Sequence, residues 1–133
     1  MNIQFEKPTP EDYVSLRLRS GMGSKDLERS RIALENSLFT ASIYDEAKLI
    51  GFGRIVGDGG ITYVVSDIMV DKDYWRRGYA DQIMKVIHNY LNENTYEDSY
   101  ISLIANAPAD LLYKKYQFEY LPENKCGMLR KQN

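Results

Sequence analysis

The chain has 133 residues, 44% of them hydrophobic and 27% charged, with a formal net charge of −2. This length suits one domain with a single core, and the composition is that of a globular rather than a disordered chain. The slight negative charge argues against non-specific binding to nucleic acid, which needs a surplus of lysine and arginine. We therefore expect one domain over residues 1–133.

Membrane segments, disulfides and metal sites find little support in the sequence. No apolar run approaches the ~20 residues that a membrane-spanning helix needs. The N-terminal letters MNIQFEKPTPED lack the pattern of a secretion signal. Cys126 is the single cysteine, and no cysteine and histidine residues have the spacing of metal ligands. We expect a cytoplasmic protein that binds neither a metal nor a membrane.

The first 38 residues predict a short strand followed by two helices. Residues 3–5 alternate weakly and favour a first strand. Thr9 is placed to cap a helix that begins at Pro10, with acidic residues in its first turn. A second helix is expected over residues 25–38, capped by Ser24. Its thin apolar stripe predicts that it is largely exposed.

The middle of the chain predicts three antiparallel strands and then a strand–helix–strand unit. Three β-rich runs, at residues 39–45, 48–56 and 61–70, are separated by the turn-like letters DEAK and GDGG. Residues 81–91 have apolar side chains at helical spacing, and residues 100–105 form a short apolar run. A strand–helix–strand passage of this kind places its two strands parallel.

The last part of the chain predicts one short helix and two closing strands. Residues 107–116 favour the helix, and residues 118–121 and 126–131 favour the strands. The complete order is β-α-α-β-β-β-α-β-α-β-β. This alternation predicts a mixed α/β domain.

Positive charge and bare backbone gather where the helix after the third β-rich run begins, in DYWRRGYADQIM, residues 73–84. The first N–H groups of a helix lack partners within it, and the aligned peptide dipoles add about +0.5 charge there. Gly78 lets a ligand approach the backbone, and Arg76 and Arg77 add charge. The letters match neither Gly-x-Gly-x-x-Gly nor a Walker loop. A phosphate or pyrophosphate site is expected, and an ordinary helix start is the alternative.

Residues 70–80 resemble the cofactor-binding motif of the GNAT superfamily of N-acetyltransferases. That motif reads Gln/Arg-x-x-Gly-x-Gly/Ala after a strand that ends in Val-x-Pro. The matching positions are Val70, Gly78 and Ala80. Lys72 replaces the frequent proline and Trp75 the first Gln/Arg. Trp75 is expected to cap the core or to cover the adenine of the cofactor.

A second resemblance follows in residues 101–121. The superfamily's other signature reads Asn-x-x-Ala-x-x-(Leu/Phe)-Tyr-x-Lys-x-Gly-Phe. The fitting positions are Asn106, Ala109, Leu112, Tyr113, Lys115 and Phe118. Gln117 replaces the usual glycine, and the N-terminal half matches only in element order. The resemblance implies a GNAT-like fold, with about four helices flanking a mixed, mostly antiparallel sheet of six to seven strands.

The resemblance also implies an activity and a cosubstrate. It implies that an acetyl group moves from acetyl-CoA to a primary amine of a small molecule or peptide, by direct attack in a ternary complex. The pyrophosphate is expected at the helix start, and the pantetheine arm on the preceding strand, which in this superfamily splays from its neighbour at a bulge. The implied cofactor-binding residues are Ile68, Met69, Val70, Arg76, Arg77, Gly78, Tyr79, Ala80, Asp81 and Asn106.

The resemblance implies a proton donor and an oxyanion donor, but it leaves the general base open. Tyr113 matches the family tyrosine near the thioester sulfur and is the expected general acid, with a core-filling aromatic as the alternative. A backbone N–H near Met69 is the expected oxyanion donor. Val64 occupies the position of a glutamate base in some members, so the base is Asp67 or a water relay.

Other functions and the acceptor stay open at this point. One alternative is an acyl-CoA-binding sensor or interaction domain without transferase activity. Another is a nucleic-acid-binding or protein-binding domain, which the net charge disfavours. The acceptor walls are expected in residues 17–26, 57–60 and 122–128, and both a monomer and a homodimer are compatible with the sequence. Five acidic residues weakly favour a cationic amine: Glu11, Asp12, Asp45, Asp58 and Asp67.

Overall fold

A computed structural model describes residues 1–132 of the chain, and contacts within it divide the chain into two compact units. The first unit is Met1–Leu103, and it contains the whole five-stranded sheet and the three longest helices. The second unit begins at Ile104 and contains one short helix.

The five strands of the first unit follow each other across the sheet in chain order. They are β1 (Ile3–Gln4), β2 (Phe39–Asp45), β3 (Lys48–Gly57), β4 (Thr62–Val70) and β5 (Tyr100–Ser102). The pairs from β1 to β4 are antiparallel, and β5 runs parallel to β4. The predicted meander and the predicted parallel pair are therefore confirmed.

Three helices and a 3-10 turn complete the first unit. They are α1 (Pro10–Ser20), α2 (Leu27–Glu35), η1 (Lys72–Tyr74) and α3 (Tyr79–Asn94). Thr9 caps α1 as predicted. The predicted cap of α2 is wrong, because the Asp26 carboxylate, rather than Ser24, accepts a hydrogen bond from the Arg29 N–H at 2.9 Å. A negative charge at a helix start also interacts favourably with the helix dipole.

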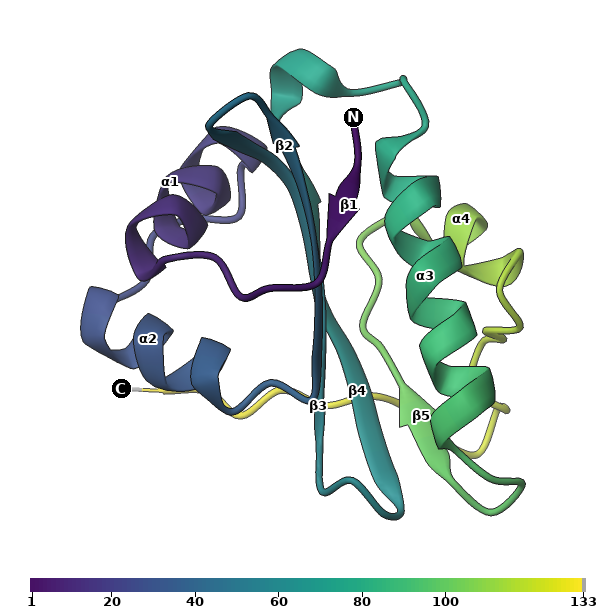
Figure 1. Cartoon of the computed structure of the whole chain (residues 1–133). Helices are drawn as coiled ribbons and strands as arrows, with labels where there is room; N and C mark the ends of the chain where they lie inside the picture. The colour runs from purple at the N-terminus through teal and green to yellow at the C-terminus, as the bar shows by residue number, and fades with distance from the viewer. Residues whose placement is uncertain (133) are drawn as a thin grey trace. The chain divides into compact units, whose positions relative to one another are not determined.

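The helices lie on both faces of the sheet, with α1 and α2 on one face and α3 on the other (Figure 1). The core on the first face contains Tyr13, Leu16, Leu34, Leu49, Phe52 and Met69. On the other face α3 buries Ile83, Met84, Ile87 and Leu91, and each such side chain contributes roughly 1.5–3 kcal/mol. A Cβ at Gly53 would lie 2.6 Å from Ile68 and 2.7 Å from Ile83. The glycine therefore allows α3 to pack closely on β3.

The second unit departs from the prediction. Helix α4 (Asp110–Lys114) lies within the predicted range, but residues 118–121 and 126–131 do not form strands (Figure 1). The sheet therefore has five strands in residues 1–132 rather than six to seven. Alternating apolar residues permit a strand, but a strand exists only where a partner completes its hydrogen bonds. Here the Tyr120 hydroxyl instead donates a hydrogen bond to Asp110 within the same unit.

Candidate active site

The end of β4 presents an edge without a strand partner. β5 pairs only with residues 62–64, and no strand in residues 1–132 pairs with the same edge beyond Val64. On the other side, the Asp71 N–H donates to the Ile50 carbonyl at 2.8 Å. Because peptide groups alternate along a strand, those of Met69 also face β3, while those of Ile68 and Val70 face the open edge.

A β-bulge lies where this edge becomes open. Phe52 pairs with Met69 and Arg54 with Ser66, so β4 carries an extra residue over this interval. Asp67 has a φ of +56°, in the left-handed region that a side chain seldom adopts. A bulge bends the strand that carries it and increases its local twist. The bulge implied by the family resemblance is present.

The start of α3 differs from the other helix starts of the first unit. Side-chain oxygens of Thr9, Asp26 and Asp71 accept backbone N–H groups at the starts of α1, α2 and η1. Helix α3 begins after Gly78, which has no side chain and makes no cap. The initial N–H groups of this 16-residue helix are therefore not closed off by a capping side chain, which is the condition for an anion to bind them.

The backbone before α3 has the conformation that gathers N–H groups. Arg76 has a φ of +64° and Gly78 a φ of +82°. Left-handed residues of this kind turn successive N–H groups toward one side and form a concave anion site. A Cβ at Gly78 would meet nothing within 4 Å, so the space next to the backbone is open. Arg76 and Arg77 have exposed side chains and add positive charge.

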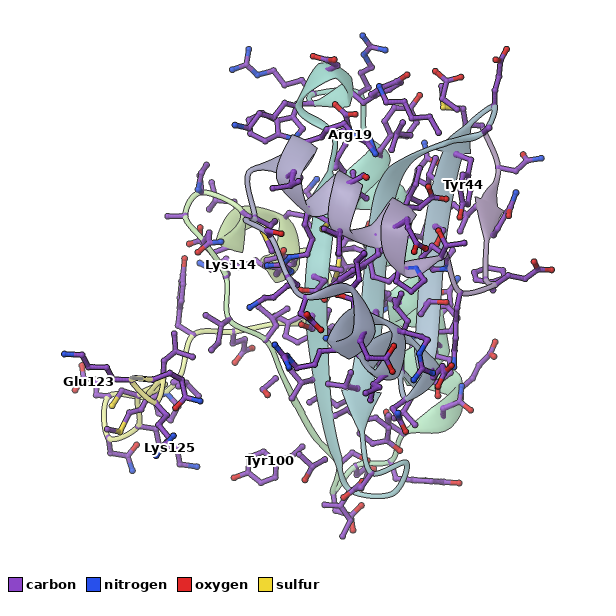
Figure 2. All side chains as sticks on the ribbon, turned by 90° about the vertical axis from the view of Figure 1, so that its left-hand side faces the viewer. Arg19, Tyr44, Tyr100, Lys114, Glu123 and Lys125 are labelled. Atoms are coloured by element: carbon purple, nitrogen blue, oxygen red, sulfur yellow. The ribbon has the colours of Figure 1, made fainter. Side chains whose placement is uncertain are left out.

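A buried carboxylate anchors the turn between β4 and α3. Asp71 accepts hydrogen bonds from Arg19 at 2.8 Å and from the Asp73 N–H at 2.9 Å, and the Lys48 ammonium lies 3.5 Å away. Arg19 also donates to the Leu49 carbonyl, so it ties α1 to both the turn and β3 (Figure 2). Removing Arg19 would leave the buried Asp71 carboxylate with Lys48 as its remaining cationic partner, which is unfavourable. These contacts connect the turn that leads into α3 to α1 and β3.

Trp75 holds the same turn from the other end. Its ring is half exposed, with a relative exposure of 50%, so it lies outside the buried core. The indole N–H donates to the Val70 carbonyl at 2.7 Å. This carbonyl faces the open edge of β4, and the tryptophan is therefore part of that edge.

Asp67 has three hydrogen-bond partners. Its carboxylate accepts from the Tyr13 hydroxyl at 2.5 Å, Arg54 Nε at 2.7 Å and Arg17 Nη1 at 3.1 Å. Burial alone would raise the pKa of Asp67, but these hydrogen bonds and the two positive charges outweigh it and lower the pKa. A carboxylate held in this way is a weak proton acceptor. Its geometry favours a structural role over that of a general base.

Two predicted site residues belong to the second unit. Asn106 is exposed and precedes α4, and Tyr113 lies within α4 with a buried side chain. Burial raises the pKa of Tyr113 above its ordinary value of 10.0. The remaining predicted residues, from Ile68 to Asp81, all belong to the first unit and lie at the end of β4, in the turn before α3 or in the first turn of α3.

Three arginines that build this region were not predicted from the sequence. Arg17, Arg19 and Arg54 all bind the carboxylates that hold the bulge and the turn. A signal for Arg17 was present, since Tyr13, Leu16 and Arg17 share one helical face and only the arginine is charged. A charged residue on an apolar helix face needs a buried partner.

Residues 1–132 contain neither a candidate metal site nor a candidate membrane-spanning helix. No group of three or more histidine, cysteine, aspartate and glutamate side chains gathers there in the manner of a metal site. No helix among these residues has the length and apolar character needed to cross a membrane.

Comparisons with known proteins agree with the geometry. A family model described as acetyltransferase (GNAT) domain matches residues 36–120. A structure from methicillin-resistant Staphylococcus aureus, of a protein of unknown function described as a probable acetyltransferase, is 40% identical with a TM-score of 0.92, and the match covers 98% of each chain. A GNAT family acetyltransferase from Streptococcus pneumoniae is 25% identical with a TM-score of 0.77, over 99% of this chain and 97% of that one.

A curated relative shows the same family. The uncharacterized N-acetyltransferase ycf52 of Gracilaria tenuistipitata var. liui is 30% identical over an alignment of 113 residues that covers 81% of this chain. The match spans 60% of that relative's length. The matched family model covers most of the chain, including both the edge of β4 and the start of α3. The chain therefore belongs to the family of GNAT acetyltransferases.

Proposed function

We propose that the chain transfers the acetyl group of acetyl-CoA to a primary amine of a small molecule or peptide, by direct attack in a ternary complex. The observation that carries this proposal is the uncapped start of α3 directly after a β4 edge that has no strand partner. One feature suits a diphosphate and the other suits a chain of amides. The strand edge comes directly before the helix start in the chain, just as the amide arm of the cofactor is joined directly to its diphosphate.

The start of α3 fits the diphosphate of acetyl-CoA. Gly78 leaves open space beside the backbone, and the N–H groups of residues 76–81 are the donors. Arg76 and Arg77 supply charge that strengthens such hydrogen bonds. Tyr79, Ala80 and Asp81 form the first turn of the helix and offer their backbone rather than their side chains in this proposal.

The edge of β4 fits the pantetheine arm. An extended chain of amides can bind to a free strand edge as an additional strand does. Ile68 and Val70 turn their peptide groups to that edge, and Met69 lies between them with its side chain in the core. The Val70 carbonyl already accepts the Trp75 indole, which leaves the Val70 N–H and both groups of Ile68 for the ligand. The oxyanion donor next to Met69 is accordingly one of these two N–H groups.

The transfer itself needs few protein groups. Acetyl-CoA supplies an acetyl thioester, so a C–N bond forms to the amine while the C–S bond breaks. The amine loses a proton, and the departing sulfur gains one. Tyr113 is the proposed proton donor. A tyrosine is protonated at neutral pH, and burial raises the pKa of Tyr113 further. Asp67 is held by two arginines, so a water relay is the proposed route for the amine proton. Alignment of the two reactants supplies much of the acceleration.

The proposed acceptor is a primary amine. The acidic residues of the chain do not show whether the rest of that molecule is cationic. Three of the five acidic residues that suggested a cationic amine already have protein partners. Asp67 binds arginines, Asp45 accepts the Tyr74 hydroxyl, and Asp58 accepts three N–H groups of its own turn. This removes most of the support for a cationic acceptor. The proposal therefore keeps both small molecules and peptides as acceptors.

Calorimetric titration with acetyl-CoA, followed by a screen of primary amines with detection of free CoA thiol, tests this function. Binding together with amine-dependent thiol release supports the transferase. Binding without release from any amine supports the alternative of an acyl-CoA sensor. Absence of binding overturns both proposals.

A further inference from the structure

The side chain of Arg17 connects three parts of the first unit. It projects from α1 and is only 8% exposed. Nε donates to the Gly23 carbonyl at 2.9 Å, Nη2 to the Met22 carbonyl at 2.8 Å, and Nη1 to Asp67 at 3.1 Å. One guanidinium thus contacts its own helix's following loop and the bulge of β4.

The loop after α1 gains two of its contacts from this guanidinium, beside the hydrogen bond that the Met22 N–H donates to the Arg17 carbonyl. It runs from residue 21 to residue 26 between α1 and the start of α2. Gly21 and Gly23 both have left-handed φ values, of +85° and +80°, and a chain with two such residues has a wide choice of conformations when nothing holds it. The Arg17 guanidinium binds two successive carbonyls through its planar fork of donors, a geometry that the point charge of a lysine does not reproduce.

The bulge is held more firmly than the loop. Asp67 also accepts hydrogen bonds from Tyr13 and Arg54, so its carboxylate keeps two other partners if Arg17 is altered. These are the charged and titratable groups bound to that carboxylate from α1 and β3. The Arg17 contact to Asp67 is therefore not needed to neutralise a buried charge, because Arg54 does so on its own. What the Arg17–Asp67 contact adds is a link between the bulge and the loop of residues 21–26.

We propose that Arg17 is a positioning residue that fixes the loop of residues 21–26 against the bulge of β4. Under the proposed function, that loop forms a wall for the acceptor amine, and the bulge precedes the Ile68 and Val70 edge that receives the thioester arm. Arg17 then fixes the position of the acceptor wall relative to the β4 edge that receives the thioester arm. This inference rests on the proposed function for its meaning, but not for the physical link between loop and bulge.

Hydrogen exchange of the backbone amides, read by NMR on the whole chain without ligand, tests the link. Arg17→Lys keeps a positive charge for Asp67 and loses the two-carbonyl clamp. We expect about tenfold faster exchange in residues 22–26, with residues 66–69 and the core strands unchanged. Asp67→Asn also lowers the stability of the whole chain, so its exchange is compared with that of the core strands. Relative to those strands we expect faster exchange at the bulge and also in the loop, because the Arg17 guanidinium that holds the two loop carbonyls loses its carboxylate partner.

A matched control lies two residues further along the same helix. Arg19 also binds an aspartate and a backbone carbonyl, but its partners are Asp71 and Leu49 rather than the loop. Arg19→Lys should leave exchange in residues 22–26 unchanged. A uniform rise across α1 and the sheet in Arg17→Lys would show a general loss of stability and overturn the proposal. An unchanged loop in either Arg17→Lys or Asp67→Asn would overturn it as well.

Titration with acetyl-CoA separates this proposal from the proposed function. We expect Arg17→Lys to bind acetyl-CoA within about twofold of the parent chain, because Arg54 and Tyr13 still hold Asp67. A tenfold or greater loss in the variant would place Arg17 in support of the donor edge instead and contradict the inference. If the parent chain fails to bind acetyl-CoA, the function fails while the exchange result still decides the link.

Discussion

The indole N–H of Trp75 donates a 2.7 Å hydrogen bond to the carbonyl of Val70, five residues earlier in the chain. This bond closes the turn between the end of β4 and the start of α3. It also occupies one acceptor on an edge that otherwise has no strand partner. The family motif most often has Gln or Arg at this position, and here an aromatic donor links the two halves of the proposed cofactor site.

Trp75→Phe tests that link. The substitution keeps an aromatic ring and removes the donor, so the turn loses one hydrogen bond worth about 1 kcal/mol. We expect acetyl-CoA to bind roughly fivefold more weakly in calorimetric titration, which corresponds to about 1 kcal/mol. Tighter binding would mean that the indole competes with the ligand for the Val70 carbonyl.

Gly78→Ala tests the start of α3. A side chain in the left-handed conformation costs about 1–2 kcal/mol, and the new methyl group occupies the open space beside the N–H groups. We expect a loss of acetyl-CoA affinity of about tenfold or more. Gly23→Ala is the control, because Gly23 has a similar φ of +80° and its Cβ would likewise meet nothing within 4 Å. Equal loss in both variants would show that strain alone, rather than the anion site, is responsible.

Tyr113→Phe tests the proposed acid. Removing the hydroxyl should lower turnover by about 100-fold and leave acetyl-CoA affinity nearly unchanged. Tyr116→Phe, in the same unit, should retain turnover. Because burial raises the pKa of Tyr113, its protonated and active form persists to higher pH than in an ordinary tyrosine. Any alkaline loss of activity that depends on Tyr113 should therefore lie above pH 10, and a Tyr113-dependent loss near pH 8 would contradict the assignment.

Asp67→Asn tests the bulge. The pKa of Asp67 is lowered in the folded chain, so its contribution to stability is present above the unfolded value of about 3.9 and is lost as the pH falls through the folded pKa. We expect the variant to be less stable than the parent chain by about 3 kcal/mol at pH 7, measured by urea unfolding. The difference should shrink below about pH 4. A difference that is constant from pH 7 to pH 3 would show that the carboxylate charge is not what matters.

Much of the first unit could be predicted from local pattern alone. The three middle strands, the cap at Thr9, and the buried face of α3 through Ile83, Ile87 and Leu91 all follow from periodicity and capping chemistry. These are local signals, because a side chain's direction repeats with the period of its own element. The glycine before α3 is a signal of the same kind, since a left-handed residue ahead of a helix favours glycine.

The closing strands and the cap of α2 show where local pattern was insufficient. Residues 118–121 and 126–131 alternate as strands do, yet pairing decides whether a strand forms, and pairing is not written in a single segment. At α2, Ser24 and Asp26 are both suitable caps, and local letters did not choose between them. Packing of Ser30 and Leu34 on the buried side is consistent with the later start.

The sequence by itself determined the class of fold, the family and the position of the turn proposed to bind the diphosphate, because each depends on residues that are neighbours in the chain. Only the tertiary structure revealed the ion pairs of Arg17 and Arg54 with Asp67 and of Arg19 with Asp71, which join residues 13 to 52 positions apart. These pairs favour a structural role for Asp67 at the bulge over the role of a general base. The physical reason is that a carboxylate's pKa and reach depend on which charges surround it in space, and burial brings those charges together only when the chain folds.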